Sequence, residues 1–224
     1  RLRVREMPAV RTSVVDALEA TPRALPASAR GQRTRAALLR AGRAVFERDG
    51  FVDSRIVDVT AEAGVSVGSF YTHFASREEL LAAVLTAVED DMLRSTVPTE
   101  PAGHPYDAVD AANRGYLAAY RRNARMNAVM EQVAAIDPAF MALRRRRADA
   151  FVRRNADGIR KLQRRGEADA DLDPLLTAEA LSYMVSGMAN RAFVHGRRVS
   201  FERLVQTANR LWANALRLEI PEGR

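Results

Sequence analysis

The chain has 224 residues, of which 47% are hydrophobic, and this is enough apolar material to bury a sizeable core. It contains no cysteine, which excludes disulfides, thiolate zinc sites and cysteine nucleophiles together. No apolar run approaches the ~18 residues needed to span a bilayer, and no charged-then-apolar signal opens the chain. We therefore expect a globular cytoplasmic protein that has no membrane partner.

The net charge of +7 favours polyanionic partners, but most of the excess lies away from the first part of the chain. Residues 30–77 contain eight arginines against five acidic residues, whereas residues 114–165 contain thirteen arginines and Lys161, the only lysine, against four. The run Arg144 to Arg147 cannot face one partner, because successive helical residues point about 100° apart. A solvated face with a few ion pairs is the leading interpretation. The alternative is that one or two of these arginines meet an anionic ligand such as an acyl-coenzyme A.

Residues 1–29 predict a flexible N-terminal arm, in which Val14 to Ala20 can form one or two helical turns before Pro22 and Pro26 stop the helix. From Gln32 onward, apolar residues recur at the 3.6-residue spacing of a helix. We expect Asp49–Gly50 to end that helix.

Two short helices are predicted next. Ser54 is a candidate N-cap for a helix that runs to Ala63, and Gly64 can take the left-handed conformation that ends it. Ser66 can cap a third helix through Phe74, and a fourth begins at Ser76.

The stretch from Ser95 to Pro105 holds three prolines and a glycine, and it is the clearest break in the chain. Helical spacing dominates again beyond it, and no convincing alternating strand or internal repeat is present. The sequence thus predicts an all-α protein. The later helices are expected near residues 106–122, 124–135, 138–166, 175–195 and 201–218.

The stretch Gly64–Gly68 fits two different motifs. Its letters match G-x-S-x-G, the nucleophile elbow of serine hydrolases, but that elbow needs a strand leading into Ser66. The preceding residues 59–63 lack a run of β-branched or aromatic side chains. The same residues also fit the turn of a helix-turn-helix, whose second helix enters the DNA major groove. We favour the second interpretation and expect a protein that is not an enzyme.

Residues 34–85 resemble the TetR family of transcriptional regulators. The resemblance rests on Thr34-Arg-Ala-Ala-Leu-Leu-Arg-Ala-Gly-Arg-Ala-Val-Phe, Gly50-Phe51, Val59-Thr60, Ala63-Gly64-Val65-Ser66 and Phe70-Tyr-Thr-His-Phe-Ala-Ser-Arg-Glu-Glu-Leu-Leu. Two departures are Arg77, where the family usually has lysine, and Val59-Thr60, where Ile-Ala is commoner.

The resemblance implies about nine helices in three parts: a flexible arm (1–29), a three-helix DNA-binding domain with a helix-turn-helix (30–77), and a helical ligand-binding and dimerisation domain (78–224). It implies a repressor that binds double-stranded DNA and is released by a small effector, which we expect to be largely apolar. The apolar residues of the last two helices, near 175–195 and 201–218, predict that these helices pair across a two-fold axis in a homodimer, which would bind a near-palindromic operator. The DNA-binding candidates are Arg33, Arg35, Ser54, Ser66, Val67, Gly68, Ser69, Tyr71, Thr72, His73 and Arg77. We expect Ser54, Ser66, Tyr71, His73 and Arg77 to hold phosphates, and Val67, Gly68 and Ser69 to approach base edges.

Large, adaptable side chains in the second region are the candidates for lining an effector pocket, together with one polar group for orientation. They are Tyr116, Tyr120, Met130, Phe151, Met184, Met188 and Asn190. His73, His104 and His195 lack metal-ligand spacing, so neither a metal nor another cofactor is expected. Two alternatives remain at this point: a helical small-molecule binder with weak DNA binding, and a serine hydrolase that uses Ser66.

Overall fold

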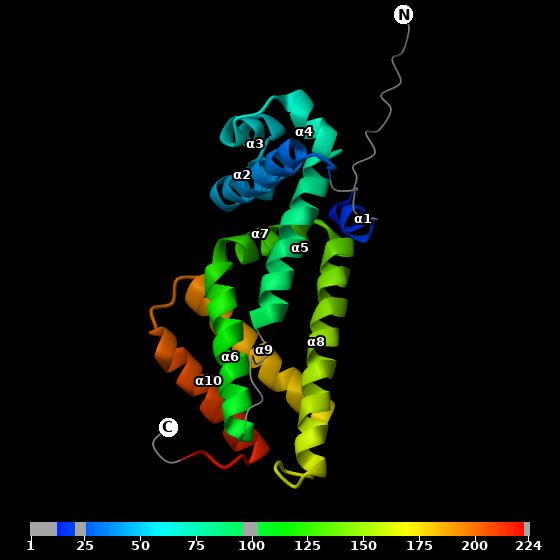
Figure 1. Ribbon diagram of the computed structural model, residues 1–224. Helices are drawn as coiled ribbons and strands as arrows, with labels where there is room; N and C mark the ends of the chain where they lie inside the picture. The colour runs from blue at the N-terminus through cyan, green and yellow to red at the C-terminus, as the bar shows by residue number, and fades with distance from the viewer. Residues whose placement is uncertain (1–12, 21–25, 96–102, 222–224) are drawn as a thin grey trace, which may run out of the picture.

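The computed structural model describes residues 13–20, 26–95 and 103–221, and these residues form ten α-helices and no strand (Figure 1). The helices are α1 (Val14–Glu19), α2 (Ala29–Asp53), α3 (Ile56–Ala63), α4 (Val67–His73), α5 (Arg77–Ser95), α6 (Pro105–Arg122), α7 (Ala124–Ile136), α8 (Pro138–Arg164), α9 (Pro174–Phe193) and α10 (Phe201–Leu216). The prediction of an all-α protein is confirmed. No helix in the described ranges is long and apolar enough to cross a membrane.

Two glycines interrupt or end helices near the places that the sequence predicts, and Gly64 does so in the predicted left-handed conformation. Gly50 interrupts α2 with φ 76° and ψ 175°, so the helix kinks there and the last turn runs in a new direction. Gly64 ends α3 with φ 65° and ψ 35°. Both conformations lie at positive φ, which glycine adopts without the steric cost that a Cβ would bring.

The expectation of a flexible arm over residues 1–29 is wrong for residues 13–20, which form α1. The Ser13 side chain caps this helix in a capping box with Asp16. Val14 and Val15 are only 3% and 7% exposed, because α1 packs against α5 and α8. The remaining parts of the expected arm, residues 1–12 and 21–25, lie outside the described residues. The extra helix makes ten where the resemblance implied about nine.

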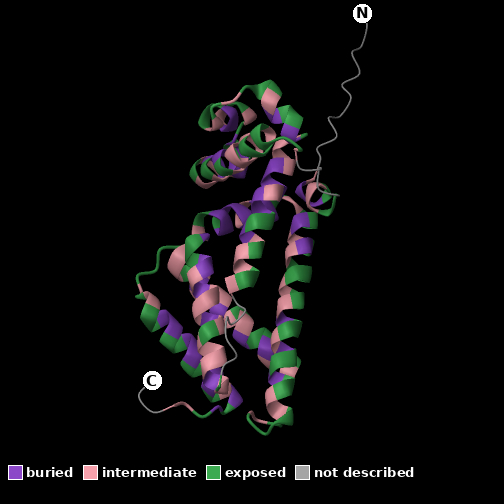
Figure 2. Cartoon of the chain, viewed as in Figure 1, coloured by how far each residue is buried: buried purple, intermediate pink, exposed green. Residues whose placement is uncertain are grey.

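The buried residues form two clusters. Figure 2 colours the buried parts of each helix purple. The first joins α1 to α5 with α7 and the start of α8, and it includes Leu38, Phe46, Phe70 and Leu81. The second joins α6, the rest of α8, α9 and α10. The first core therefore continues past residue 77 into α5, α7 and α8. The helices α1 to α4 consequently share one hydrophobic core with α5 and α7, and they do not form a separately packed unit.

Candidate nucleic-acid interface and ligand cavity

The stretch Gly64–Gly68 connects two helices, α3 and α4. Ser66 is the N-cap of α4, and its hydroxyl oxygen accepts a hydrogen bond from the Ser69 amide at 3.1 Å. The Val65 amide donates to the Thr60 carbonyl oxygen at 3.0 Å, which closes the end of α3. A helix rather than a strand leads into Ser66, so the nucleophile-elbow alternative is wrong.

Buried side chains set the angle at which α4 leaves the turn. Val59 on α3, Phe70 on α4 and Phe74 at its end are each 0% exposed. The Phe70 and Phe74 rings lie 5.8 Å apart in a tilted arrangement. These contacts fix one face of α4 against the body of the protein, so its opposite face is presented outward.

The outward face of α4 carries the residues that we expect to approach DNA. Val67 is 40% exposed and Tyr71 is 51% exposed, and Gly68 and Thr72 are also exposed. Ser69 is half-buried beside them. Gly68 has no Cβ, so the backbone of α4 can approach another molecule closely at this point.

A shallow cleft of about 410 Å³ lies between the beginning of α2 and α4. Arg30 and Arg35 line it from α2, and Ser69 and Thr72 line it from α4. The Arg35 guanidinium lies 5.0 Å from the centre of the Phe74 ring, which orients it. Arg33 is exposed on α2 but is not among the lining residues of this cleft. Cationic and hydroxyl groups in one cleft are suited to a phosphate.

Ser54 and His73 are much less exposed than the sequence led us to expect. The Ser54 side chain is 1% exposed, and its hydroxyl donates to the Phe51 carbonyl oxygen at 2.8 Å. It therefore closes the end of α2. The N-cap of α3 is Arg55, whose side chain makes no capping hydrogen bond to the α3 backbone. His73 is only 8% exposed. The expectation that Ser54 holds a phosphate is wrong for this conformation, because its side chain is buried. His73 lines the cleft described above together with Arg35 and Ser69, so its phosphate contact stays a prediction.

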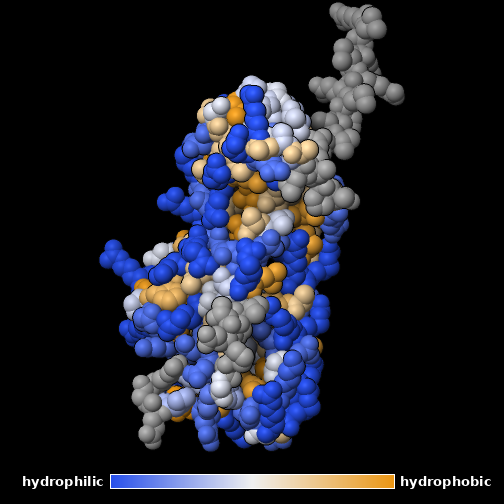
Figure 3. All heavy atoms as spheres, viewed as in Figure 1, coloured by the Kyte–Doolittle hydropathy of each residue, from blue (hydrophilic) through white to orange (hydrophobic). Residues whose placement is uncertain are grey.

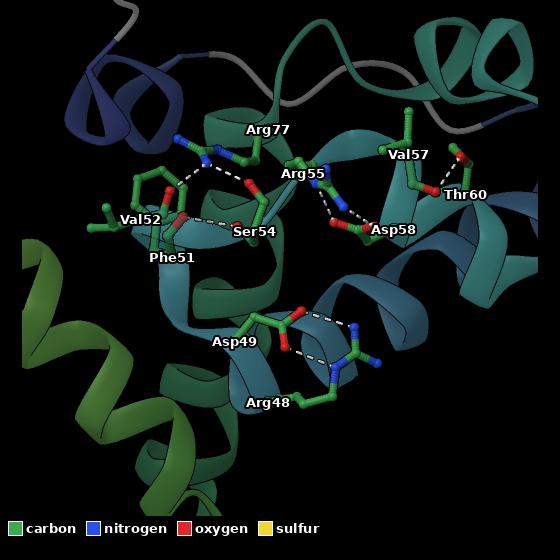
Figure 4. A network of polar contacts seen from close by, with 10 residues as sticks. All are labelled: Arg48, Asp49, Phe51, Val52, Ser54, Arg55, Val57, Asp58, Thr60 and Arg77. Carbon is green, nitrogen blue, oxygen red and sulfur yellow. Dashed lines mark hydrogen bonds and ion pairs between the residues drawn. The ribbon is translucent and has the colours of Figure 1, made fainter.

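Arg77 is also turned inward (Figure 4). Its Nη1 donates to the carbonyl oxygen of Ser54 at 2.6 Å and to that of Val52 at 3.3 Å. Its guanidinium lies 4.3 Å from the centre of the Phe51 ring. The planar side chain thus joins the start of α5 to the end of α2. The prediction that Arg77 contacts a phosphate is therefore corrected: in this conformation the side chain stabilises the packing of α5 on the end of α2.

A second site lies in the lower half of the molecule, where a cavity of about 330 Å³ opens between α6, α8, α9 and α10. Its walls are mainly apolar. The lining residues are Pro105, Ala108, Val109, Ala112, Asn113, Tyr116, Phe151, Arg154, Asn155, Gly158, Ile159, Lys161, Leu162, Arg165, Ser182, Val185, Trp212 and Leu216. Burial raises the pKa of the Tyr116 phenol to about 12, so this side chain stays neutral and keeps its donor near pH 7.

The family model for bacterial regulatory proteins of the tetR family matches residues 38–84, which span α3, α4 and the parts of α2 and α5 that pack on them. These residues belong to the TetR family. The chain is 26% identical over 160 residues to the A-factor receptor protein of Streptomyces griseus. That match covers 71% of this chain and 55% of the receptor, so it spans little more than half of the relative's length.

Solved structures of TetR-like regulators share the fold. A TetR-family regulator from Rhodococcus sp. is 25% identical, with a TM-score of 0.66 over 82% of this chain and 98% of that one. A transcriptional regulator from Saccharomonospora viridis, solved in complex with choline, is 20% identical, with a TM-score of 0.70 over 81% and 96%. The fatty acid degradation regulator FadR from Bacillus halodurans is 12% identical, with a TM-score of 0.68 over 83% and 97%.

The structure brings only two of the seven expected ligand residues, Tyr116 and Phe151, to the cavity. Their rings lie 6.0 Å apart. Met130 lies in the first core, away from the cavity, and Met184 and Met188 pack against the second core without lining it.

Tyr120 and Asn190 form a separate polar cluster. The Asn190 side-chain amide donates to the Tyr120 hydroxyl at 3.3 Å and to the Glu131 carboxylate. Burial raises the pKa of the Tyr120 phenol as well. Because Asn190 already holds these partners, it does not serve as the orienting group of the cavity described above.

Sequence reasoning found only Tyr116 on the α6 wall of the cavity and missed the α10 wall. Residues Pro105, Val109, Ala112 and Tyr116 recur at helical spacing, so their common face was visible in the sequence. Nothing in that pattern indicates which helix the face meets. Within the described ranges, no group of three or more histidine, aspartate or glutamate residues is placed to hold a metal ion.

Proposed function

We propose that this protein is a cytoplasmic TetR-family transcriptional repressor that binds a near-palindromic operator as a homodimer and is released by a small, largely apolar effector. The observation that carries the proposal is the division of α4 into two faces. Phe70 and His73 are buried, whereas Val67, Tyr71 and Thr72 stand outward beside the cationic cleft of α2. A short helix held in this way is suited to the major groove, with phosphate contacts on its flanks.

The dimer proposal is supported by an apolar stripe on α9. Leu176 is 65% exposed and Tyr183 is 51% exposed, and Ala180 and Gly187 continue the same stripe at spacings of four, three and four residues. Leu211 on α10 is 41% exposed. Such a stripe favours pairing with a second copy about a two-fold axis. The pairing would set two α4 helices against successive major grooves, ~34 Å apart or a multiple of it.

The proposed effector acts by differential affinity. A ligand that binds the DNA-free conformation more tightly than the DNA-bound one must weaken DNA binding by the same factor. We also propose that the chain has two functional parts. Residues 30–77 would bind DNA, and residues 78–224 would bind the ligand and form the dimer. Since the first core extends across residue 77, α5 and α7 are the elements suited to transmit such a change.

The test is selection of bound duplexes from a random-sequence DNA library, followed by band-shift titration of the enriched site. We expect an inverted repeat. Tyr71→Phe should weaken binding to it about fivefold, the equivalent of about 1 kcal/mol for one hydrogen bond. Thr86→Val, which also removes one exposed hydroxyl but on α5, should leave affinity unchanged. Failure to enrich any repeat would contradict the proposal.

A further inference from the structure

The cavity between α6, α8, α9 and α10 has an uneven distribution of charge. Its interior is formed by apolar residues such as Val109, Phe151 and Val185. Three cationic residues, Arg154, Lys161 and Arg165, also line it, and all three are exposed, so they form its rim. None of the described residues that line it is an aspartate or glutamate. The local field therefore favours a negatively charged group at the edge and an apolar one inside.

The rim follows from the helical repeat of α8. Lys161 and Arg165 lie seven and eleven residues beyond Arg154, so all three project within about 40° of one another at 100° per residue. The stripe extends for about 16 Å along the helix. Leu162 and Phe151 occupy the adjacent stripe that faces the cavity. An amphipathic molecule can thus place its tail on one stripe and its head on the next.

The three cations differ in what they already contact. The Arg165 guanidinium lies 3.7 Å from the Glu167 carboxylate, and that of Arg154 lies 5.0 Å from the centre of the Phe151 ring. Lys161 has no ion pair with any described residue. Lys161 is therefore the group on the rim whose charge is most available to a ligand.

Gly158 is exposed and lies at the mouth of the cavity, next to the cationic rim. It lies in the middle of α8, where glycine lowers helix stability by about 0.5–1 kcal/mol relative to alanine. A Cβ placed at this position would meet no atom within 4 Å. Close helix packing therefore does not require the glycine. Its missing side chain instead enlarges the space that a ligand can fill.

We propose that this cavity binds an amphipathic monocarboxylate, with its tail between α6 and α8 and its carboxylate at Lys161 on the rim. The volume of about 330 Å³ corresponds to about ten non-hydrogen atoms at ~30 Å³ each. A straight-chain acid of about this size is octanoate. The claim that this ligand is the effector of the regulator rests on the proposed function. The claim that it binds the cavity does not depend on that function.

Trp212 provides a direct probe, because it lines the cavity and is the only tryptophan in the chain. The DNA-free protein is titrated with octanoate, with octan-1-ol and with octyltrimethylammonium, and the Trp212 emission is recorded. We expect saturable binding of octanoate, octanol binding at least about tenfold weaker, and no saturable binding of the cation. Equal affinity for octanoate and octanol, or tighter binding of the cation, would overturn the proposal.

Three variants locate the ligand. Lys161→Gln should weaken octanoate about tenfold and leave octanol unchanged. Arg153→Gln, an exposed change on α8 outside the cavity, is the matched control for charge and should alter neither. Gly158→Leu should abolish binding of both ligands while the melting temperature stays the same or rises, because the side chain occupies open space. Retention of binding by a folded Gly158→Leu variant would place the ligand elsewhere and overturn the proposal.

The two proposals fail separately. Octanoate binding is read on the protein without DNA, so its absence leaves operator binding intact. Tight octanoate binding by a chain that enriches no DNA repeat would overturn the repressor proposal and retain the carboxylate site. A band shift with added octanoate links them, and we expect release of the DNA.

Discussion

At the scale of single residues, the guanidinium of Arg77 is the clearest case in which burial changes a predicted role. The sequence places it at the start of α5, where a cation can reach DNA. Its Nη1 instead donates to the Ser54 carbonyl oxygen at 2.6 Å, and the side chain is 22% exposed. A carbonyl at the end of a helix has no partner within that helix, so it attracts a donor from elsewhere. The planar guanidinium of arginine can donate to these oxygens through Nη1 while it stacks on the Phe51 ring, which the compact ammonium of lysine matches less well.

We predict that Arg77→Ala lowers the free energy of unfolding by about 2 kcal/mol, because a charged donor to a partly buried carbonyl is lost. The melting temperature should fall by about 4–8 °C for a chain of this size. Arg40→Ala, an exposed change on α2, is the control and should have little effect. If Arg77→Ala leaves stability unchanged but lowers the salt dependence of DNA binding by about one unit, its role as a phosphate contact stands instead.

At the scale of elements, α1 joins the helix-turn-helix end of the molecule to the long helices below it. Val14 and Val15 enter the first core, and the Ser13 hydroxyl donates to the Asp137 carboxylate at 3.0 Å, at the beginning of α8. Glu19 forms an exposed ion pair with Arg146 at 2.9 Å. Six helical residues have too few internal hydrogen bonds to be stable alone, so these tertiary contacts hold the helix.

We predict that the double change Val14→Ala and Val15→Ala lowers the free energy of unfolding by about 3 kcal/mol, at ~0.8 kcal/mol for each buried methylene removed. Urea denaturation followed by circular dichroism measures this effect. Glu19→Gln removes only an exposed ion pair and should leave the midpoint nearly unchanged. Equal midpoints for the double variant and the unmodified protein would mean that α1 does not stay docked in solution.

At the scale of the whole molecule, the α9 stripe determines whether two copies can form the proposed regulator. Gly187 lies on this stripe, and a Cβ built on it meets no atom of its own chain within 4 Å. A longer side chain at this position therefore leaves the single chain undisturbed. Across a two-fold axis it would meet the α9 stripe of the second copy, because symmetry brings the same surface of both subunits together.

We predict that Gly187→Arg converts the dimer into a monomer, because each arginine would be desolvated against the apolar stripe of the other copy without a partner for its charge. Analytical ultracentrifugation at micromolar concentration measures this change, and binding to an inverted repeat should weaken with it. Ala111→Arg, an exposed change on α6, adds the same charge and should leave the dimer intact. A Gly187→Arg protein that still sediments as a dimer would show that the copies pair through another surface.

Figure 3 shows one face of the molecule coloured by hydropathy. Hydrophilic residues cover most of that face, and apolar patches show between them. In the Arg144–Arg147 run, the last three arginines are exposed, and Arg146 is paired to Glu19 and Arg147 to Glu89. The cations at the cavity rim lie further along the same helix.

The sequence by itself determined the helices and the helix-turn-helix. Helical spacing of apolar residues, the cap at Ser66, and the glycines at positions 50 and 64 are local signals, because each acts through neighbours within about one turn. These signals predicted the long helices from α2 onward to within a few residues. They also placed Val67, Gly68 and Tyr71 on the outward face of α4, where the structure has them.

Only the tertiary structure decided which side chains of these helices face inward and what they meet. Ser54, His73 and Arg77 are polar, and nothing next to them in the sequence shows that the end of α2 and the core cover them. The same holds for α1, whose two valines become stabilising only against α5 and α8. The cavity needs four helices from distant parts of the chain. Burial is a property of such long-range packing, whereas helix formation depends mainly on neighbours, so the sequence predicts the second more reliably than the first.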